Sequence, residues 1–98
     1  MDKKEFEMEI KKMLHTGWGE SKKCLYGSEN SGIFIRGEIE LQDYFVQDRI
    51  ISIYRGDDGE ITFELDKYDF FRIDQDEFGN CVYVMKNKNN TVSLWLAP

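Results

Sequence analysis

The chain reads Arg-Ile-Ile-Ser-Ile-Tyr-Arg-Gly-Asp-Asp-Gly-Glu-Ile-Thr-Phe-Glu-Leu from Arg49 to Leu65, and this stretch decides the fold. Asp58 and Gly59 are residue types that tolerate positive φ, as the turn of a hairpin requires. On both sides of this turn an apolar side chain recurs at every second position, at Ile51, Ile53, Ile61, Phe63 and Leu65. The stretch therefore predicts a β-hairpin with one apolar face.

The N-terminal segment has the features of an amphipathic helix that begins near Asp2. Asp2 and Glu5 have the spacing of a capping box, and Gly17 is a residue type that ends helices. The apolar side chains fall on one helical face, at Phe6, Ile10, Met13 and Leu14. A helix of about thirteen residues is marginal alone, so we expect this face to pack on the rest of the chain.

Between the helix and the hairpin, alternation and turn residues predict two strands. A short strand at residues 22–26 is followed by a polar loop at residues 27–32 and a long strand at residues 33–41. Gly37 falls on the apolar side of the long strand, where a glycine typically marks a bulge or a bend. Residues 42–48 are too short and too polar at both ends to assign, and are expected to form a connection.

After the hairpin, the aromatic run at residues 67–74 predicts one more strand, and residues 81–86 and 91–96 predict a closing hairpin. No linker or internal repeat divides the chain, so residues 1–98 form one domain. The predicted fold class is α+β, with the N-terminal helix packed on a curved antiparallel sheet of about six strands. The sheet either stays open under the helix or closes partly into a small barrel.

The charge of the chain is acidic and unevenly distributed. Thirteen basic and nineteen acidic residues give a net charge of −6, and residues 26–98 hold fourteen of the acids against seven basic residues. Binding to nucleic acid depends on Lys and Arg, so direct nucleic-acid binding is not expected. A protein partner with a basic surface is the natural complement.

No apolar run approaches the ~20 residues of a membrane span or the core of a signal peptide, so we expect a cytoplasmic protein without membrane contact. Cys24 and Cys81 lack CxxC spacing, and are expected to be free thiols that behave as small buried hydrophobes.

No pattern of catalytic or metal-ligating residues is present. Residues 74–79 resemble the start of a calcium loop, but Phe78 stands at position 5 and Met85 at position 12, where oxygen ligands are required. His15 is the only histidine, and the negative end of the helix dipole accounts for it. We therefore expect no catalytic residues, no metal and no cofactor, and a protein that is not an enzyme.

The leading hypothesis for function is a non-enzymatic acidic binding or inhibitor protein that occupies a basic site on a protein target. In one form of this hypothesis, the acidic surface imitates the charge of a nucleic acid that the target binds. In composition the chain resembles toxin-immunity and phage anti-defence proteins. The carboxylates expected to form the acidic face alternate with core residues or protrude at the hairpin turn: Glu38, Glu40, Asp57, Asp58, Glu60 and Glu64.

Two alternatives belong to other classes. One is a module that binds a small ligand or a peptide in an aromatic-lined groove. Its candidate residues lie in connections or on the outward phase of strands: Trp18, Tyr44, Phe45, Tyr68 and Trp95. The other is an accessory subunit or homodimer that associates through an exposed strand edge, such as residues 91–96.

Overall fold

In the residues that the structure describes, the chain folds as one α-helix followed by eight strands. The computed structural model describes residues 1–17, 23–54 and 59–97. The elements are α1 (Lys3–Gly17), β1 (Lys23–Asn30), β2 (Ile33–Glu40), β3 (Asp43–Gln47), β4 (Ile50–Tyr54), β5 (Glu60–Glu64), the 3₁₀ turn η1 (Leu65–Lys67), β6 (Phe70–Gln75), β7 (Cys81–Lys86) and β8 (Thr91–Ala97).

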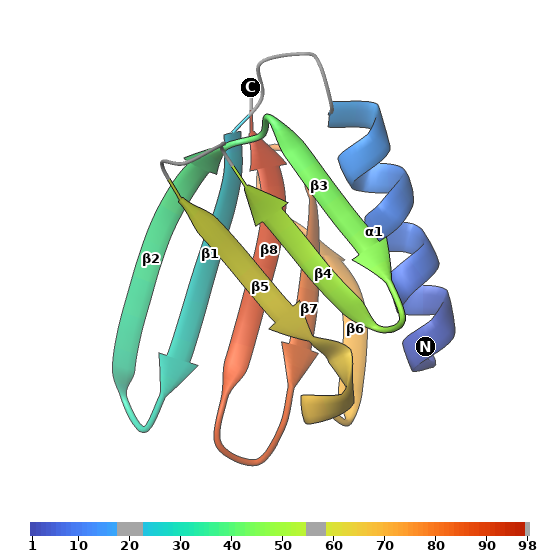
Figure 1. Ribbon diagram of the computed structural model, residues 1–98. Helices are drawn as coiled ribbons and strands as arrows, with labels where there is room; N and C mark the ends of the chain where they lie inside the picture. Colours follow the sequence, from blue (N-terminus) through green and yellow to red (C-terminus); the bar gives the residue numbers. More distant parts are fainter. Residues whose placement is uncertain (18–22, 55–58, 98) are drawn as a thin grey trace.

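The strands form two antiparallel sheets. One has five strands in the order β2-β1-β8-β7-β6, and the other has three in the order β3-β4-β5. The smaller sheet lies across one face of the larger one, and α1 runs beside both (Figure 1). The α+β class is confirmed, whereas the prediction of one sheet of about six strands is wrong. Within the described residues no pairing joins β2 to β3 or β5 to β6, so the strands do not close into a barrel.

The predicted central hairpin is present as β4 and β5. Ile51 pairs with Phe63 and Ile53 with Ile61, so the apolar residues of both strands share one face. Ile51 and Ile53 are fully buried. Residues 42–48 do not form a simple connection, because β3 pairs with β4 and places Val46 opposite Ile51 in the core. The local pattern of β3 is weak, and its pairing with an already apolar hairpin determines its structure.

The helix begins and docks as its sequence predicts. The backbone amide of Glu5 donates a 2.8 Å hydrogen bond to Oδ1 of Asp2, and this bond lowers the pKa of the Asp2 carboxyl. On the buried face, three side chains have no exposed surface: Phe6, Ile10 and Leu14. The Phe6 ring lies 5.0 Å from that of Phe71 and 6.1 Å from that of Tyr83, measured between ring centroids. The helix therefore covers part of the inner face of the five-stranded sheet, at β6 and β7.

The hairpin of β1 and β2 is longer than the sequence predicts. Ser31 and Gly32 have φ values of 51° and 83°, so the turn needs only these two residues, and the predicted loop at residues 27–32 is wrong. The pairing runs from Asn30 with Ile33 to Lys23 with Glu40 without interruption, so no bulge is present at Gly37.

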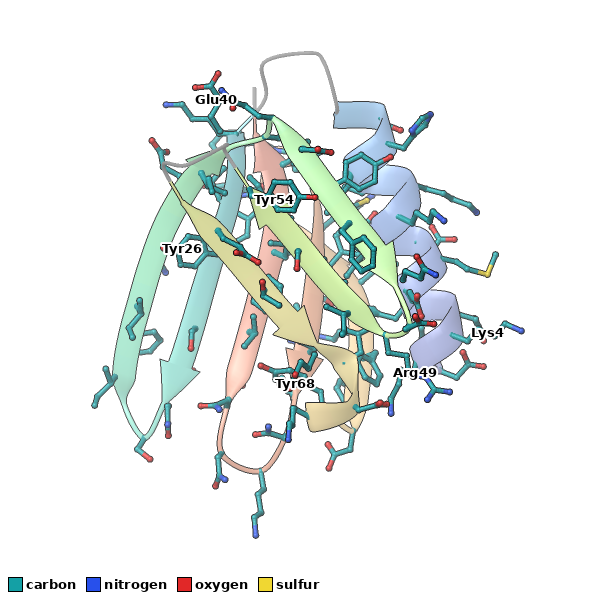
Figure 2. The ribbon with its side chains drawn as sticks, in the orientation of Figure 1. Lys4, Tyr26, Glu40, Arg49, Tyr54 and Tyr68 are labelled. Carbon is teal, nitrogen blue, oxygen red and sulfur yellow. The ribbon has the colours of Figure 1, made fainter. Side chains whose placement is uncertain are left out.

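Gly37 allows the close approach of a neighbouring side chain, and does not form the predicted bulge. A Cβ atom at this position would overlap the side chain of Tyr26, its partner on β1. The Tyr26 ring packs against the core from this position (Figure 2). The absence of a side chain at Gly37 thus makes room for a cross-strand aromatic residue.

The last strand lies in the interior of the larger sheet. β8 pairs with β7 on one side and with β1 on the other. The prediction that residues 91–96 form an exposed edge is therefore wrong, because β1 pairs along the whole strand and β7 pairs with residues 91–94 on the other side. The edges of the larger sheet are β2 and β6.

The two thiols have different environments. Both cysteines are free; Cys24 is fully buried in the core, whereas Cys81 is exposed, contrary to the prediction for that residue. Burial raises the pKa of the Cys24 thiol to about 12.

Candidate functional site: a groove on the outer face of the five-stranded sheet

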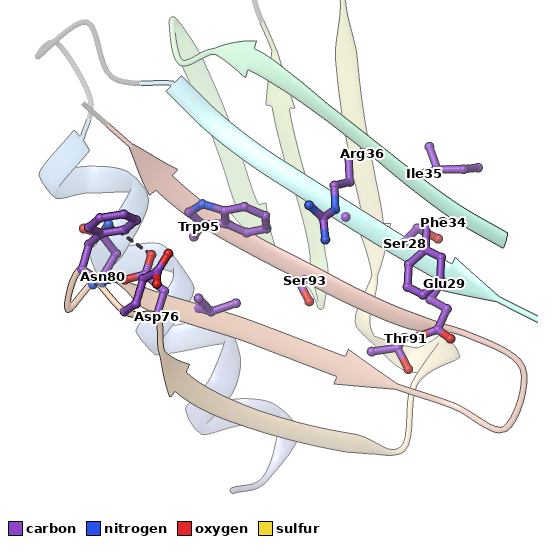
Figure 3. Close-up of a pocket in the computed structure, with 14 residues that line it drawn as sticks. Ser28, Glu29, Phe34, Ile35, Arg36, Asp76, Asn80, Thr91, Ser93 and Trp95 are labelled. Atoms are coloured by element: carbon purple, nitrogen blue, oxygen red, sulfur yellow. Dashed lines mark hydrogen bonds between the residues drawn. The ribbon is translucent and has the colours of Figure 1, made fainter. Parts of the chain in front are cut away.

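The outer face of the larger sheet, turned away from β3–β5 and α1, is hollowed into a groove. Its volume is about 1080 Å³. Residues from β1, β2, β7, β8 and the β6–β7 turn line it (Figure 3): Gly27, Ser28, Glu29, Phe34, Ile35, Arg36, Asp76, Glu77, Phe78, Asn80, Val82, Thr91, Ser93 and Trp95.

Strand alternation on β8 builds the floor of the groove. Val92 and Leu94 point inward and are buried in the core, so Thr91, Ser93 and Trp95 face outward. In the sequence Trp95 alternates with Val92, Leu94 and Leu96, and this phase is compatible with a place under the helix or on an outward surface. The structure places it in the groove, between Asp76 and Asn80 on one side and Arg36 on the other (Figure 3).

Two exposed phenylalanines stand at opposite sides of the groove. Phe34 projects from the edge strand β2 and is 66% exposed, while Phe78 projects from the β6–β7 turn and is 81% exposed. Large apolar side chains with this much contact to water are typical of binding surfaces when they border one concave site.

Hydrogen bonds fix the turn that presents Phe78. Oδ1 of Asp76 accepts from the backbone amides of Phe78 and Asn80, both at 2.9 Å, and Oδ2 accepts from the Asn80 side-chain amide at 3.2 Å. Gly79 completes the turn with a φ of 83°. Desolvation raises the pKa of the Asp76 carboxyl, but these hydrogen bonds outweigh it, and the pKa lies below its ordinary value. Asp76 therefore carries a negative charge at neutral pH.

The charges in the groove are unequal. Glu29, Asp76 and Glu77 contribute three carboxylates, and Arg36 contributes the one positive side chain among the described lining residues. In the part of the chain that the structure describes, the side chain of Arg36 has no ion-pair or hydrogen-bond partner. The lining thus has an excess of two negative charges, and it favours a ligand with cationic groups.

The aromatic residues predicted from sequence are dispersed. Trp95 lines the groove, whereas Tyr44 and Tyr68 pack against the core. The Tyr44 hydroxyl lies 3.0 Å from Nδ1 of His15, and burial raises the pKa of Tyr68. Phe45 is exposed on the outer face of the three-stranded sheet, and Trp18 lies outside the described residues.

The predicted acidic residues do not share one surface. Glu38 faces outward on β2, where its Oε1 lies 3.2 Å from Nζ of Lys23. Glu60 and Glu64 face outward on β5, in the sheet on the other side of the molecule.

The remaining acidic candidates have other positions. Glu40 is half-buried at the end of β2 (Figure 2) and has an interaction partner. Glu60 accepts a 2.8 Å hydrogen bond from Oγ1 of Thr62 on its own strand. Asp57 and Asp58 lie outside the described residues.

Sequence reasoning missed most of the groove. The outward phase of Phe34 and Arg36 is readable from their alternation with Ile33 and Ile35, and a phenylalanine inside a polar turn, as at Phe78, signals exposure. That these residues border one cavity depends on the order of the strands, which no local pattern contains.

Among the described residues, no group of three or more His, Cys, Asp or Glu side chains is arranged to hold a metal ion. Nor does any helix in the described ranges have the length and apolar content of a membrane span. No family model, curated protein or solved structure matches the chain.

Proposed function

We propose that the chain is a non-enzymatic binding protein that holds an extended segment of a partner protein in the outer groove. The segment combines apolar side chains with at least one Lys or Arg. The observation that carries this proposal is the groove itself, with Trp95 in its floor and the exposed Phe34 and Phe78 at its sides.

The groove has the size and lining of a recognition site. Its volume is slightly above the range for small-molecule pockets, which is roughly 300–1,000 Å³, and it is open along the sheet. The three aromatic side chains provide apolar area that a bound segment would cover, and aromatic residues often carry most of the binding energy of an interface. Thr91 and Ser93 add hydroxyls that can orient polar groups.

Charge defines the chemistry of the segment. The excess of negative charge around the groove agrees with the acidic net charge of the chain, and both favour a basic partner. A Lys or Arg placed over the Trp95 ring would gain a cation–π interaction close to the ionised Asp76.

The described lining favours binding over catalysis. It contains hydroxyls and carboxylates but no His, Lys or Cys to act as a base near neutral pH. The lowered pKa of Asp76 makes this carboxylate a weak base, and its hydrogen bonds are used to hold the turn.

The test is selection of random short peptides, displayed on phage, against the immobilised protein. Enriched peptides are expected to combine basic and aromatic or aliphatic residues. Their affinity is then measured by fluorescence polarisation for the native chain and for the Phe78→Ala variant. Phe78 is an exposed turn residue, so its truncation should leave the fold intact while weakening binding about tenfold or more.

The matched control is Phe45→Ala, which removes an exposed phenylalanine from the outer face of the other sheet. Its affinity for the selected peptides should equal that of the native chain. Equal affinities for the native chain and Phe78→Ala, or a larger loss in Phe45→Ala, would reject the groove as the binding site.

A pair of charge reversals separates this proposal from the acidic-face inhibitor hypothesis, which remains a prediction. Glu77→Lys alters the groove, and Glu64→Lys alters the outer face of β5. The groove proposal expects slower association and a weaker salt dependence only in Glu77→Lys. The opposite result, with Glu64→Lys affected and Glu77→Lys unchanged, would favour an acidic inhibitor that uses the three-stranded sheet.

A further inference from the structure

The edge strand β2 carries an unusual run of exposed apolar residues. Ile33, Phe34 and Ile35 are 63%, 66% and 56% exposed, although they alternate between the two faces of the sheet. Phe34 and Ile35 line the groove at this edge of the sheet, and the exposure of Ile33 and Ile35 means that the three-stranded sheet does not cover them. Natural edge strands are usually shortened, charged or covered to prevent pairing with other strands, and this end of β2 has none of these protections.

The turn next to this run determines which backbone groups are available. A two-residue hairpin turn closes on a hydrogen-bonded pair, here Asn30 and Ile33, so the amides of the odd-numbered residues of β2 point toward β1. The even-numbered residues then direct their amides and carbonyls away from the sheet. Among these residues are Phe34, Arg36 and Glu38.

We propose that β2 pairs antiparallel with β2 of a second copy of this chain, about a two-fold axis at Gly37. The two five-stranded sheets then become one continuous sheet of ten strands. This inference concerns the edge of the sheet and does not depend on what the groove binds.

Charge complementarity fixes the register. With Gly37 opposite Gly37, Arg36 lies directly across from Glu38 of the second copy, and the symmetry makes this pair twice. Both residues are even-numbered, so they also exchange backbone hydrogen bonds. A shift of the axis to Arg36 would instead place two arginines opposite each other, which is unfavourable.

The apolar residues agree with the same register. Ile35 lies opposite Ile39 of the second copy on the inner face, and Ile39 already packs against the core of its own chain. Pairing therefore extends the core across the edge and covers side chains that a monomer leaves in water.

The other edge of the larger sheet lacks these properties. Arg72 and Asp74 on β6 have the same spacing as Arg36 and Glu38, but Nε of Arg72 donates a 2.7 Å hydrogen bond to Asp74 of its own chain. Phe71 of β6 is buried against the helix. On β6 the two charged side chains are thus paired with each other, whereas on β2 Glu38 lies 3.2 Å from Lys23 and Arg36 has no ion-pair partner among the described residues. β6 also lacks an uncovered apolar run like that of β2.

Sedimentation equilibrium from low to high micromolar concentration tests the pairing. The native chain should fit a monomer–dimer equilibrium. Arg36→Glu and Glu38→Arg should each raise the dimer dissociation constant by at least about tenfold, because each creates two like-charge pairs. The double variant restores opposite charges and should return close to the native value. Arg72→Glu, the same reversal on the other edge, should have no effect.

Amide hydrogen exchange gives a readout that needs no substitution. At high concentration the amides of Phe34, Arg36 and Glu38 should gain protection, while that of Gly37 is already protected by β1 at every concentration. The proposal would be overturned if the native chain stays monomeric, if the double variant dimerises as weakly as the single variants, or if Arg72→Glu dissociates the dimer. The same holds if the exchange of the even-numbered amides is independent of concentration.

Discussion

Truncation of Phe6 to alanine tests whether the helix is an integral part of the core. Phe6 has no exposed surface, and its ring lies 5.0 Å from Phe71 and 6.1 Å from Tyr83. Replacing a buried phenylalanine with alanine costs about 3–5 kcal/mol, as transfer energy and the cavity left behind add. A domain of this size has a stability of about 5–15 kcal/mol, so the variant should lose a large fraction of it.

The assay is urea unfolding followed by far-ultraviolet circular dichroism, with the free energy obtained by linear extrapolation. Met8→Ala is the matched control, because Met8 lies on the same helix and is 53% exposed. Alanine is the best helix former, so neither change penalises the helix itself. The control should stay within about 0.5 kcal/mol of the native chain.

A second buried position guards against a result particular to one aromatic side chain. Ile10→Ala should cost about 2–5 kcal/mol, because Ile10 is also fully buried. If Phe6→Ala and Ile10→Ala lose no more stability than Met8→Ala, the helix does not pack on the sheet as described. A Phe6→Leu variant keeps the measurement available if the alanine variant is too unstable to study.

Two further predictions concern Cys24 and Gly37. Burial raises the Cys24 pKa from 9.0 to about 12, so the folded state retains a proton that the unfolded state loses, and stability should fall as pH rises through this window. Cys24 contributes up to about 1.4 kcal/mol of this loss per pH unit. The free energy of unfolding, measured with urea at several alkaline pH values, should therefore fall less steeply with pH for Cys24→Ala than for the native chain. Equal pH dependences would contradict this prediction. Gly37→Ala should destabilise the chain by about 1–3 kcal/mol, because the Tyr26 side chain must move to make room for the new Cβ atom. The same substitution should cost less in a Tyr26→Leu variant. An equal cost in both would mean that the destabilisation comes from the backbone and not from Tyr26.

The elements that the sequence predicted correctly are those specified by patterns of residues close together in the chain. The Asp2 cap and the spacing of Phe6, Ile10 and Leu14 specify the start of the helix and its buried face. The alternation of apolar residues in 51–53 and 61–63 specifies the pairing of β4 with β5. Each of these signals depends on residues a few positions apart, so a single helical or extended segment contains the whole pattern.

The failures occurred where a partner strand supplied the missing information. β3 is short and polar at both ends, and its pairing with β4 makes it a strand. Residues 27–30 have the composition of a loop, but all four pair with β2 on one side, and residues 27–29 also pair with β8 on the other. Propensity is a weak guide for such segments, because pairing with a neighbouring strand outweighs it.

By itself the sequence determined the α+β class, the docking helix, the central hairpin and the outward phase of Phe34 and Arg36. Only the tertiary structure decided that β8 lies between β1 and β7, and this order brings Phe34 and Phe78 to one groove and leaves β2 as an edge. The physical reason is that the period of a strand records which side chains share a face, whereas its neighbours in the sheet are selected by the packing of the whole chain.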